Sequence, residues 1–113
     1  GQGLFDFGDV DGIGDAVRLQ HPLGVAVQGE VLIVADTYNH KLKRLGPRTR
    51  ACTSWAGNGE PGYRDGPAAT AQFYEPGGVS VAGDRVYVAD TNNHAIRVVE
   101  AASGTVSTLV LRP

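Results

Sequence analysis

Short runs of apolar residues, rich in valine, alternate with turn residues along the chain. Four runs in the first half predict strands at residues 24–28, 31–35, 41–45 and 51–56. A second series predicts strands at residues 78–82, 85–89, 95–99 and 105–110. Valine is β-branched and favours pleated sheet. Gly29-Glu30 and Gly83-Asp84 predict tight hairpins, and the second strand of each series is apolar enough to be buried on both faces.

The two series of strands are copies of one unit. The run from Pro22 to Val27 recurs at 76–81, and Val34 to His40 recurs at 88–94, both with an offset of 54 residues. Antiparallel four-stranded units repeated at such a period are typical of β-propeller blades. The predicted fold class is therefore all-β. Residues 1–57 form a connecting loop plus blade one, and residues 58–113 form a loop plus blade two. The long connection 57–76 contains a predicted short helical turn at 68–74.

The repeated motifs carry a family resemblance. In both copies, Pro-x-Gly-Val-x-Val is followed by Val-Ala-Asp-Thr-x-Asn-His-x-Leu/Ile. The connection between the copies reads Asp-Gly-Pro-Ala-Ala-Thr-Ala-Gln-Phe from Asp65 to Phe73. This arrangement resembles the NHL repeat, whose blades build six-bladed propellers in many members. The resemblance implies that the chain is part of a six-bladed propeller.

Composition narrows the classes of function. The chain has 113 residues, of which 42% are hydrophobic and 19% charged, as in a packed globular domain. The chain has ten Lys and Arg residues and twelve Asp and Glu residues, a charge balance that disfavours nucleic acid as a partner. The single cysteine, Cys52, has no internal disulfide partner and is expected to be a small core residue. With no apolar run of membrane-spanning length and no leader pattern, we expect a cytoplasmic protein without membrane contact.

The repeated Asp-Thr-x-Asn-His motif is interpreted as structural. Its aspartates are expected to accept amide hydrogen bonds from the following turn. Its asparagines are expected to adopt left-handed or turn conformations, and its histidines to pack over a strand and bond a carbonyl. A metal site is the less favoured alternative, because metal ligands converge on one point whereas this pair recurs once per blade. No metal or cofactor is therefore predicted. The motif residues are Asp36, Asn39, His40, Asp90, Asn93 and His94.

Two charged clusters are interpreted as solvated surface. The basic one is predicted to be a solvated outer edge, because its charges are not repeated at the equivalent positions of copy two. The acidic one is predicted to be a solvated loop, because its spacing does not fit a calcium loop. The basic residues are His40, Lys41, Lys43, Arg44, Arg48 and Arg50, and the acidic ones are Asp6, Asp9, Asp11 and Asp15.

The expected function is non-catalytic: the propeller segment is a scaffold that presents loops to a protein partner. The candidate binding residues are Tyr38, Arg64, Tyr74 and Asn92, which are polar or aromatic and lie in predicted loops. No catalytic residues are predicted. Two alternatives stay open. One is an RNA-binding NHL propeller that uses the basic cluster, and the other is a metal-dependent propeller similar to the amidating lyases.

Two blades alone leave an apolar face open at each end of the pair. We expect Val25, Val27, Val79 and Val81 to line these faces. Exposed apolar surface is unfavourable in water by about 25 cal/mol per Å². The expected cover is either the remaining blades of a longer chain or self-association, in which three copies would close a six-bladed ring.

Overall fold

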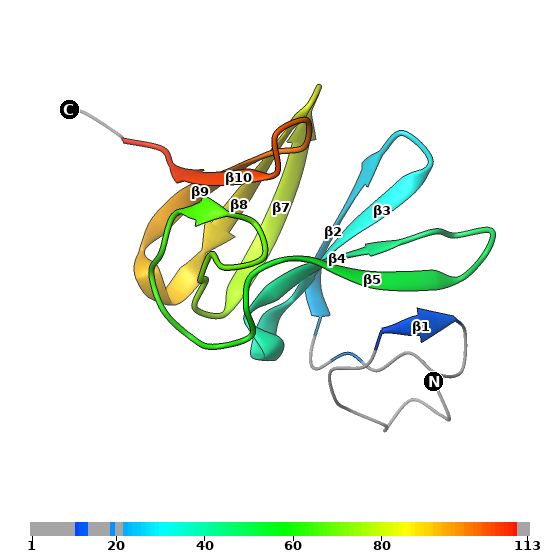
Figure 1. Ribbon diagram of the computed structural model, residues 1–113, viewed down its shortest axis with the longest axis horizontal. Helices are drawn as coiled ribbons and strands as arrows, with labels where there is room; N and C mark the ends of the chain where they lie inside the picture. Colours follow the sequence, from blue (N-terminus) through cyan, green and yellow to red (C-terminus); the bar gives the residue numbers. More distant parts are fainter. Residues whose placement is uncertain (1–10, 14–18, 20–21, 111–113) are drawn as a thin grey trace.

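Two five-stranded antiparallel sheets make up the computed structural model, which describes residues 11–13, 19 and 22–110. The sheets splay apart from a common line, as Figure 1 shows. The first has the order β1 (Gly12–Ile13), β5 (Ala51–Ala56), β4 (Lys41–Leu45), β3 (Val31–Asp36) and β2 (Pro22–Gln28). The second has the order β6 (Gly66–Pro67), β10 (Thr105–Thr108), β9 (Ala95–Glu100), β8 (Arg85–Asp90) and β7 (Pro76–Ala82). The predicted all-β pair of blades is confirmed.

The two predicted hairpins are present, and a short turn precedes the third strand of each blade. Gly29 and Gly83 have positive φ angles of 61° and 59° in two-residue hairpins, a region that glycine adopts without strain. Each third strand is preceded by a single 3-10 turn, η2 (Thr37–Asn39) or η3 (Thr91–Asn93). No helix in the described part of the chain has the length and apolar character needed to cross a membrane.

The long connection between the blades differs from its prediction. It contributes the short outer strand β6, which pairs with β10, and β1 pairs with β5 in the same way. The helical turn predicted through residue 74 is wrong. A single turn is closed by the Pro67 carbonyl, which accepts amide hydrogen bonds from Thr70 and Ala71. The chain then becomes extended because Gln72 exchanges backbone hydrogen bonds with Arg64.

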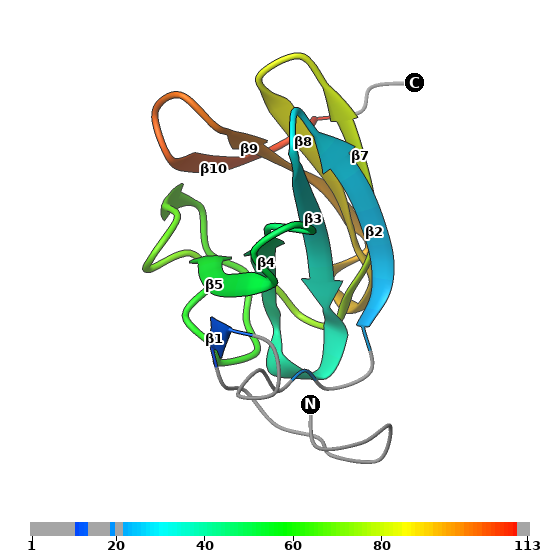
Figure 2. The ribbon, with the colours of Figure 1, turned by 90° about the vertical axis from the view of Figure 1, so that its right-hand side faces the viewer.

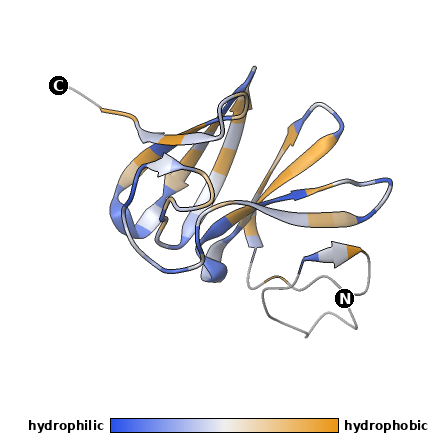
Figure 3. Ribbon diagram, viewed as in Figure 1, coloured by the Kyte–Doolittle hydropathy of each residue, from blue (hydrophilic) through white to orange (hydrophobic). Residues whose placement is uncertain are grey.

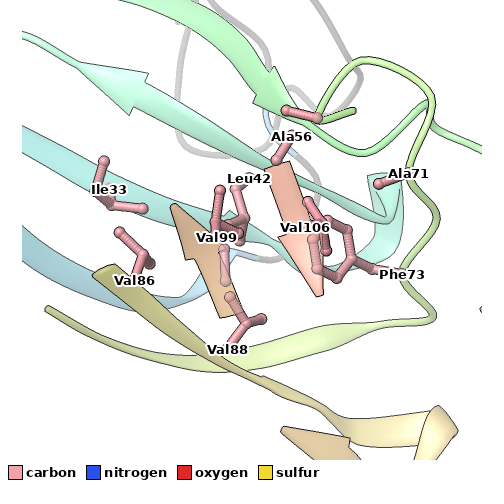
Figure 4. Packing of buried hydrophobic residues seen from close by; sticks show 11 residues of the cluster. Ile33, Leu42, Ala56, Ala71, Phe73, Val86, Val88, Val99 and Val106 are labelled. Atoms are coloured by element: carbon pink, nitrogen blue, oxygen red, sulfur yellow. The ribbon is translucent and has the colours of Figure 1, made fainter. Parts of the chain in front are cut away.

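The hydrophobic core lies between the two sheets. Blade one contributes Ile33, Ala35, Leu42 and Ala56, and blade two contributes Ala68, Ala71, Phe73, Val86, Val88, Val99 and Val106 (Figure 4). β3 is buried on both faces at its carboxyl end, as predicted, whereas β8 alternates between buried and partly exposed residues. The two strands differ in burial because blade two packs on one face of β3, whereas the corresponding face of β8 has no blade over it.

Half of the predicted open-face residues lie elsewhere. Val25 and Val27 of β2 are 59% and 64% exposed, as expected for an open face. Val79 and Val81 instead pack against the core, so their assignment to an open face is wrong. Their strand, β7, lies beside β2 at the contact between the blades (Figure 2), and hydrophobic residues follow the strands of both sheets (Figure 3).

A glycine permits the close approach of the two innermost strands. A Cβ atom added to Gly24 in β2 would collide with the carbonyl oxygen of Gly77 in β7. The equivalent residue of blade two, Gly78, has room for a Cβ, which would lie 3.7 Å from the Cβ of Ala89. The two glycines thus occupy the same position of the repeat in different surroundings.

Replacing Gly24 by alanine is expected to lower the free energy of unfolding by about 1–3 kcal/mol, because the clash is with backbone that cannot rotate away. Gly78→Ala is the matched control and should change it by less than about 0.5 kcal/mol. Urea unfolding of dilute protein measures both. Equal losses in the two variants would contradict the packing of β2 on β7.

Candidate functional site

Loops that follow the second strand of each blade converge at one end of the molecule. After Asp36 and Asp90 the chain makes a 3-10 turn and then a left-handed residue, His40 (φ 56°) or His94 (φ 52°). This geometry reverses the chain over three residues and turns the middle residue outward. Tyr38, the middle residue of η2, is 45% exposed.

Three of the four predicted binding residues lie together at this end. The Asn92 amide donates to the Tyr74 carbonyl at 3.1 Å. The Tyr74 ring stands edge-on to the His40 ring, with centroids 5.6 Å apart, and His40 ends the turn that carries Tyr38. We call Tyr38, Tyr74 and Asn92 the loop surface. Among the described residues, no hydrogen bond or ion pair joins the Arg64 side chain to it, and Arg64 takes part through its backbone, paired with Gln72.

The histidines and asparagines of the repeated motif differ in detail from their predicted roles. His40 accepts a hydrogen bond at Nδ1 from the Glu75 amide at 3.0 Å, rather than bonding a carbonyl. Asn39 and Asn93 lie in the 3-10 turns, in keeping with the predicted turn conformation, and the left-handed residues are His40 and His94. Asn93 instead donates through its side-chain amide to Asp90 and to the Gly62 carbonyl, both at 2.7 Å. Through its hydrogen bond with the Glu75 amide, His40 joins blade one to the connection that leads into blade two.

The motif aspartates do not cap their own turns, contrary to the prediction. Asp90 Oδ1 accepts the Tyr74 amide at 2.7 Å, and neither turn has a side-chain cap hydrogen bond. Asp90 Oδ2 instead accepts from Nη1 of Arg97 at 2.7 Å, with both side chains fully buried. The aspartate is thus the anion of a buried ion pair.

Arg97 is the cation of that ion pair and makes several further contacts. Its Nη1 also donates to the Gln72 carbonyl at 2.7 Å, and its Nη2 donates to the Arg64 carbonyl and to Asp65 Oδ1, both at 2.8 Å. Its guanidinium carbon lies 4.9 Å from the ring centroid of Tyr63 and 5.1 Å from that of Phe73. Charge-assisted bonds and cation–π contacts together compensate the cost of burying this charge. Nε alone has no hydrogen-bond partner among the described residues.

Blade one contains the same network with lysine as the cation. Lys43 is fully buried, with Nζ 3.3 Å from Asp36 Oδ2 and 3.5 Å from Asp11 Oδ1. Asp11 also accepts from the Ser54 amide at 2.7 Å, as Asp65 accepts from the Thr108 hydroxyl at 2.9 Å. The solvated edge predicted for Lys43 is therefore wrong. Asp11 lies in an exposed loop, as predicted, with its side chain 40% exposed although it pairs with Lys43. The other three acidic residues of that cluster lie outside the described residues.

An alignment signal in the sequence could have revealed this network. Five pairs of polar positions are related by the repeat offset: Asp11 and Asp65, Asp36 and Asp90, Asn39 and Asn93, Lys43 and Arg97, Ser54 and Thr108. Lys and Arg share a charge, and Ser and Thr share a hydroxyl. Most charges of the basic cluster are absent from copy two, and this difference hides the one cation, Lys43 or Arg97, that both blades preserve.

The acidic and thiol side chains near this end take part in the fold. Asp36, Asp65 and Asp90 are engaged by buried cations, and Cys52 is buried in β5, as predicted. Within the described residues, no three His, Cys, Asp or Glu side chains converge in the manner of metal ligands. What the loops present to solvent is a set of tyrosine, asparagine and backbone groups.

Two sheets, each closed by a strand from the connection before it and joined along their inner strands, define consecutive blades of a β-propeller. The NHL repeat matches residues 19–45 and 73–99, which span the motif in both blades. The chain therefore belongs to the NHL repeat family.

Known proteins support this assignment. The chain is 50% identical to NHL repeat-containing protein 2 of Bos taurus over 109 residues, covering 92% of this chain and 15% of that protein. It is 45% identical to Protein SUPPRESSOR OF QUENCHING 1, chloroplastic, of Arabidopsis thaliana, covering 91% of this chain and 10% of that protein. The chain thus spans only a small part of these relatives.

Solved structures show the same fold. An auxiliary nutrient binding protein from Bacteroides ovatus superposes with a TM-score of 0.76 and 26% identity, over 93% of this chain and 27% of that one. A putative phosphatase from Bacteroides thetaiotaomicron gives a TM-score of 0.74 at 21% identity, over 95% of this chain and 26% of that one. The two blades are therefore similar to a fragment of larger propeller-like structures.

Replacing Arg97 by methionine is expected to lower the free energy of unfolding by about 3–5 kcal/mol, because Asp90 is left charged and buried without its partner. Arg85→Met is the control: Arg85 pairs with Glu100 at 3.0 Å on the surface, where its side chain is 58% exposed, and the change should be about 1 kcal/mol or less. Chemical unfolding of both variants measures the difference. Similar small losses would contradict a stabilising role for the buried pair.

Proposed function

We propose that this propeller segment is a non-catalytic scaffold whose loop surface binds a protein partner. The observation that supports this function is the fixed exposure of two tyrosines at the loop end. Tyr38 is 45% exposed and Tyr74 is 39% exposed, on loops tied by short backbone hydrogen bonds. Tyrosine offers a large contact area with few rotatable bonds, and rigid presentation reduces the entropy lost on binding.

A binding role also agrees with the nature of the loops. The ring of Tyr74 is positioned by His40, and its carbonyl by Asn92, so the loop surface is preorganised before any partner arrives. One solved structure with this fold is named as an auxiliary nutrient binding protein.

RNA binding is the second candidate, and within the basic cluster only Arg48 and Arg50 are exposed. Lys43 is buried, and the guanidinium of Arg44 lies 4.3 Å from the ring centroid of Trp55. Lys41 donates to the Ser54 hydroxyl at 3.3 Å. Phosphate binding requires several accessible cations on one face. The protein-binding function is therefore the better supported one.

Replacing Tyr38 by alanine is expected to reduce partner binding at least about tenfold, because Tyr38 presents exposed aromatic surface at the loop end. Immobilised chain would be used to capture proteins, which are then quantified by mass spectrometry. The control is Arg85→Ala, at the β7–β8 hairpin away from the loops. A partner retained by the control and lost with Tyr38→Ala supports the proposal.

Two results would oppose it. If Tyr38→Ala retains every captured protein as well as the unmodified chain does, the loop surface takes no part in binding. Alternatively, filter binding could show micromolar affinity for single-stranded RNA that falls steeply with salt concentration, the behaviour of a phosphate-binding face.

A further inference from the structure

The turn between β4 and β5 contains a left-handed residue that is not glycine. The turn spans residues 46–50, and we call it the arginine turn because it carries Arg48 and Arg50. Arg50 has a φ angle of 58°, in a region that residues with a Cβ adopt only with backbone strain. β4 begins at the loop end of blade one and runs away from it. The arginine turn therefore lies at the far end of this strand from the loop surface (Figure 1).

Blade two has the same turn with glycine at this position. Gly104 is the repeat equivalent of Arg50, and its φ angle is 68°. The two turns also share the hydrogen bond that closes them. The Arg50 amide donates to the Gly46 carbonyl at 2.7 Å, and the Gly104 amide donates to the Glu100 carbonyl at 2.8 Å. The turn therefore forms with glycine, and its backbone does not require the arginine of blade one.

Two further hydrogen bonds hold the backbone of the arginine turn. The Gly46 amide donates to the Ala51 carbonyl at 2.9 Å, and the Ala51 amide donates to the Thr49 hydroxyl at 3.2 Å. Arg48 and Arg50 are therefore carried by a turn whose backbone is fixed. Such preorganisation reduces the entropy lost when a ligand binds.

The exposure of this turn does not arise from an open end of the blade pair. In blade one, Arg48 and Arg50 are exposed although blade two packs on the following side. In blade two, Ala102 stands at the repeat position of Arg48 and is exposed although blade one packs on the preceding side. A blade with neighbours on both sides therefore still presents this turn to solvent.

The two arginines of the turn are not neutralised within the described part of the chain. Neither side chain forms a hydrogen bond or an ion pair with a described residue. Lys43 and Arg97, in contrast, each pair with a buried aspartate. The segment 37–59, which contains the turn, has no Asp or Glu residue. Guanidinium groups bind carboxylates through paired N–H donors, so the turn has the chemistry of a carboxylate-binding site.

We propose that the arginine turn is a second binding surface, which binds an acidic segment of a protein partner. Carboxylates of this segment accept hydrogen bonds from Arg48 and Arg50, a function that glycine at the left-handed position could not supply. Two exposed cations match a short acidic segment. A nucleic acid requires a longer row of cations, and the net charge of −2 opposes its approach. The arginine turn acts independently of the loop surface, because the two lie at opposite ends of β4.

Fluorescence anisotropy with a labelled peptide of alternating glutamate and serine residues tests the proposal. The double variant Arg48→Ala/Arg50→Gly should bind the peptide at least about tenfold more weakly than the unmodified chain. The affinity of the unmodified chain should fall as salt is added, because the contact is electrostatic. Arg85→Ala, which removes an exposed arginine from blade two, is the charge control and should bind as the unmodified chain does. Tyr38→Ala should also bind the peptide unchanged, so that this test is separate from that of the loop surface.

Urea unfolding separates a loss of binding from a loss of folding. Arg50→Gly should raise the midpoint of unfolding, because glycine adopts the left-handed conformation without strain, while it weakens peptide binding. Gly104→Arg is the matched variant of blade two and should lower the midpoint.

Three results would overturn the proposal. One is equal peptide binding by the double variant and the unmodified chain, and another is the absence of peptide binding at low salt. The third is single-stranded RNA that binds more tightly than the peptide and is lost in the same double variant, since the turn would then be a phosphate-binding site.

Discussion

A buried cation between two aspartates holds each blade together. In blade two, Arg97 joins β9 to the end of β8 through Asp90, and to the connection between blades through Asp65. An arginine presents several donors in a planar fork, so one side chain can fix segments that are distant in sequence. Its bond to the Gln72 carbonyl holds the extended course of the connection just before Phe73 enters the core. The packing of the blades and the position of Tyr74 both depend on this arrangement.

Much of the fold was predictable because a strand and a tight turn are local features. The valine-rich runs and the glycines of the two hairpins identified the four main strands of each blade. The repeat then supplied the architecture, since one unit that cannot bury its own face requires a neighbour. The short strands β1 and β6 could not be predicted in this way. Two residues such as Gly66 and Pro67 carry no strand signal, and their pairing with β10 is set by the connection in which they lie.

The site was less predictable because its interactions link distant segments. Tyr38, Tyr74 and Asn92 were correctly expected in exposed loops, but their convergence follows from the Asn92–Tyr74 backbone bond and the contact of Tyr74 with His40. Arg64, from the same connection, is held through its backbone. Sequence patterns assign a charged residue to the surface by default, so Lys43 was misplaced. Only a comparison of Lys43 with Arg97 across the repeat indicates a cation that both blades require.

The proposed loop surface is distinct from the faces by which the blades pack. A blade buries its flat faces against its neighbours, and the loop ends remain outside this stack whatever follows blade two. Tyr38 is 45% exposed although blade one is covered, because it extends from the loop end rather than from a sheet face. His40 and its equivalent His94 lie at the boundary between these surfaces. In blade one, the ring that contacts Tyr74 edge-on also accepts the Glu75 amide of the next blade. The contact between the blades therefore also places Tyr74 against His40 at the loop end.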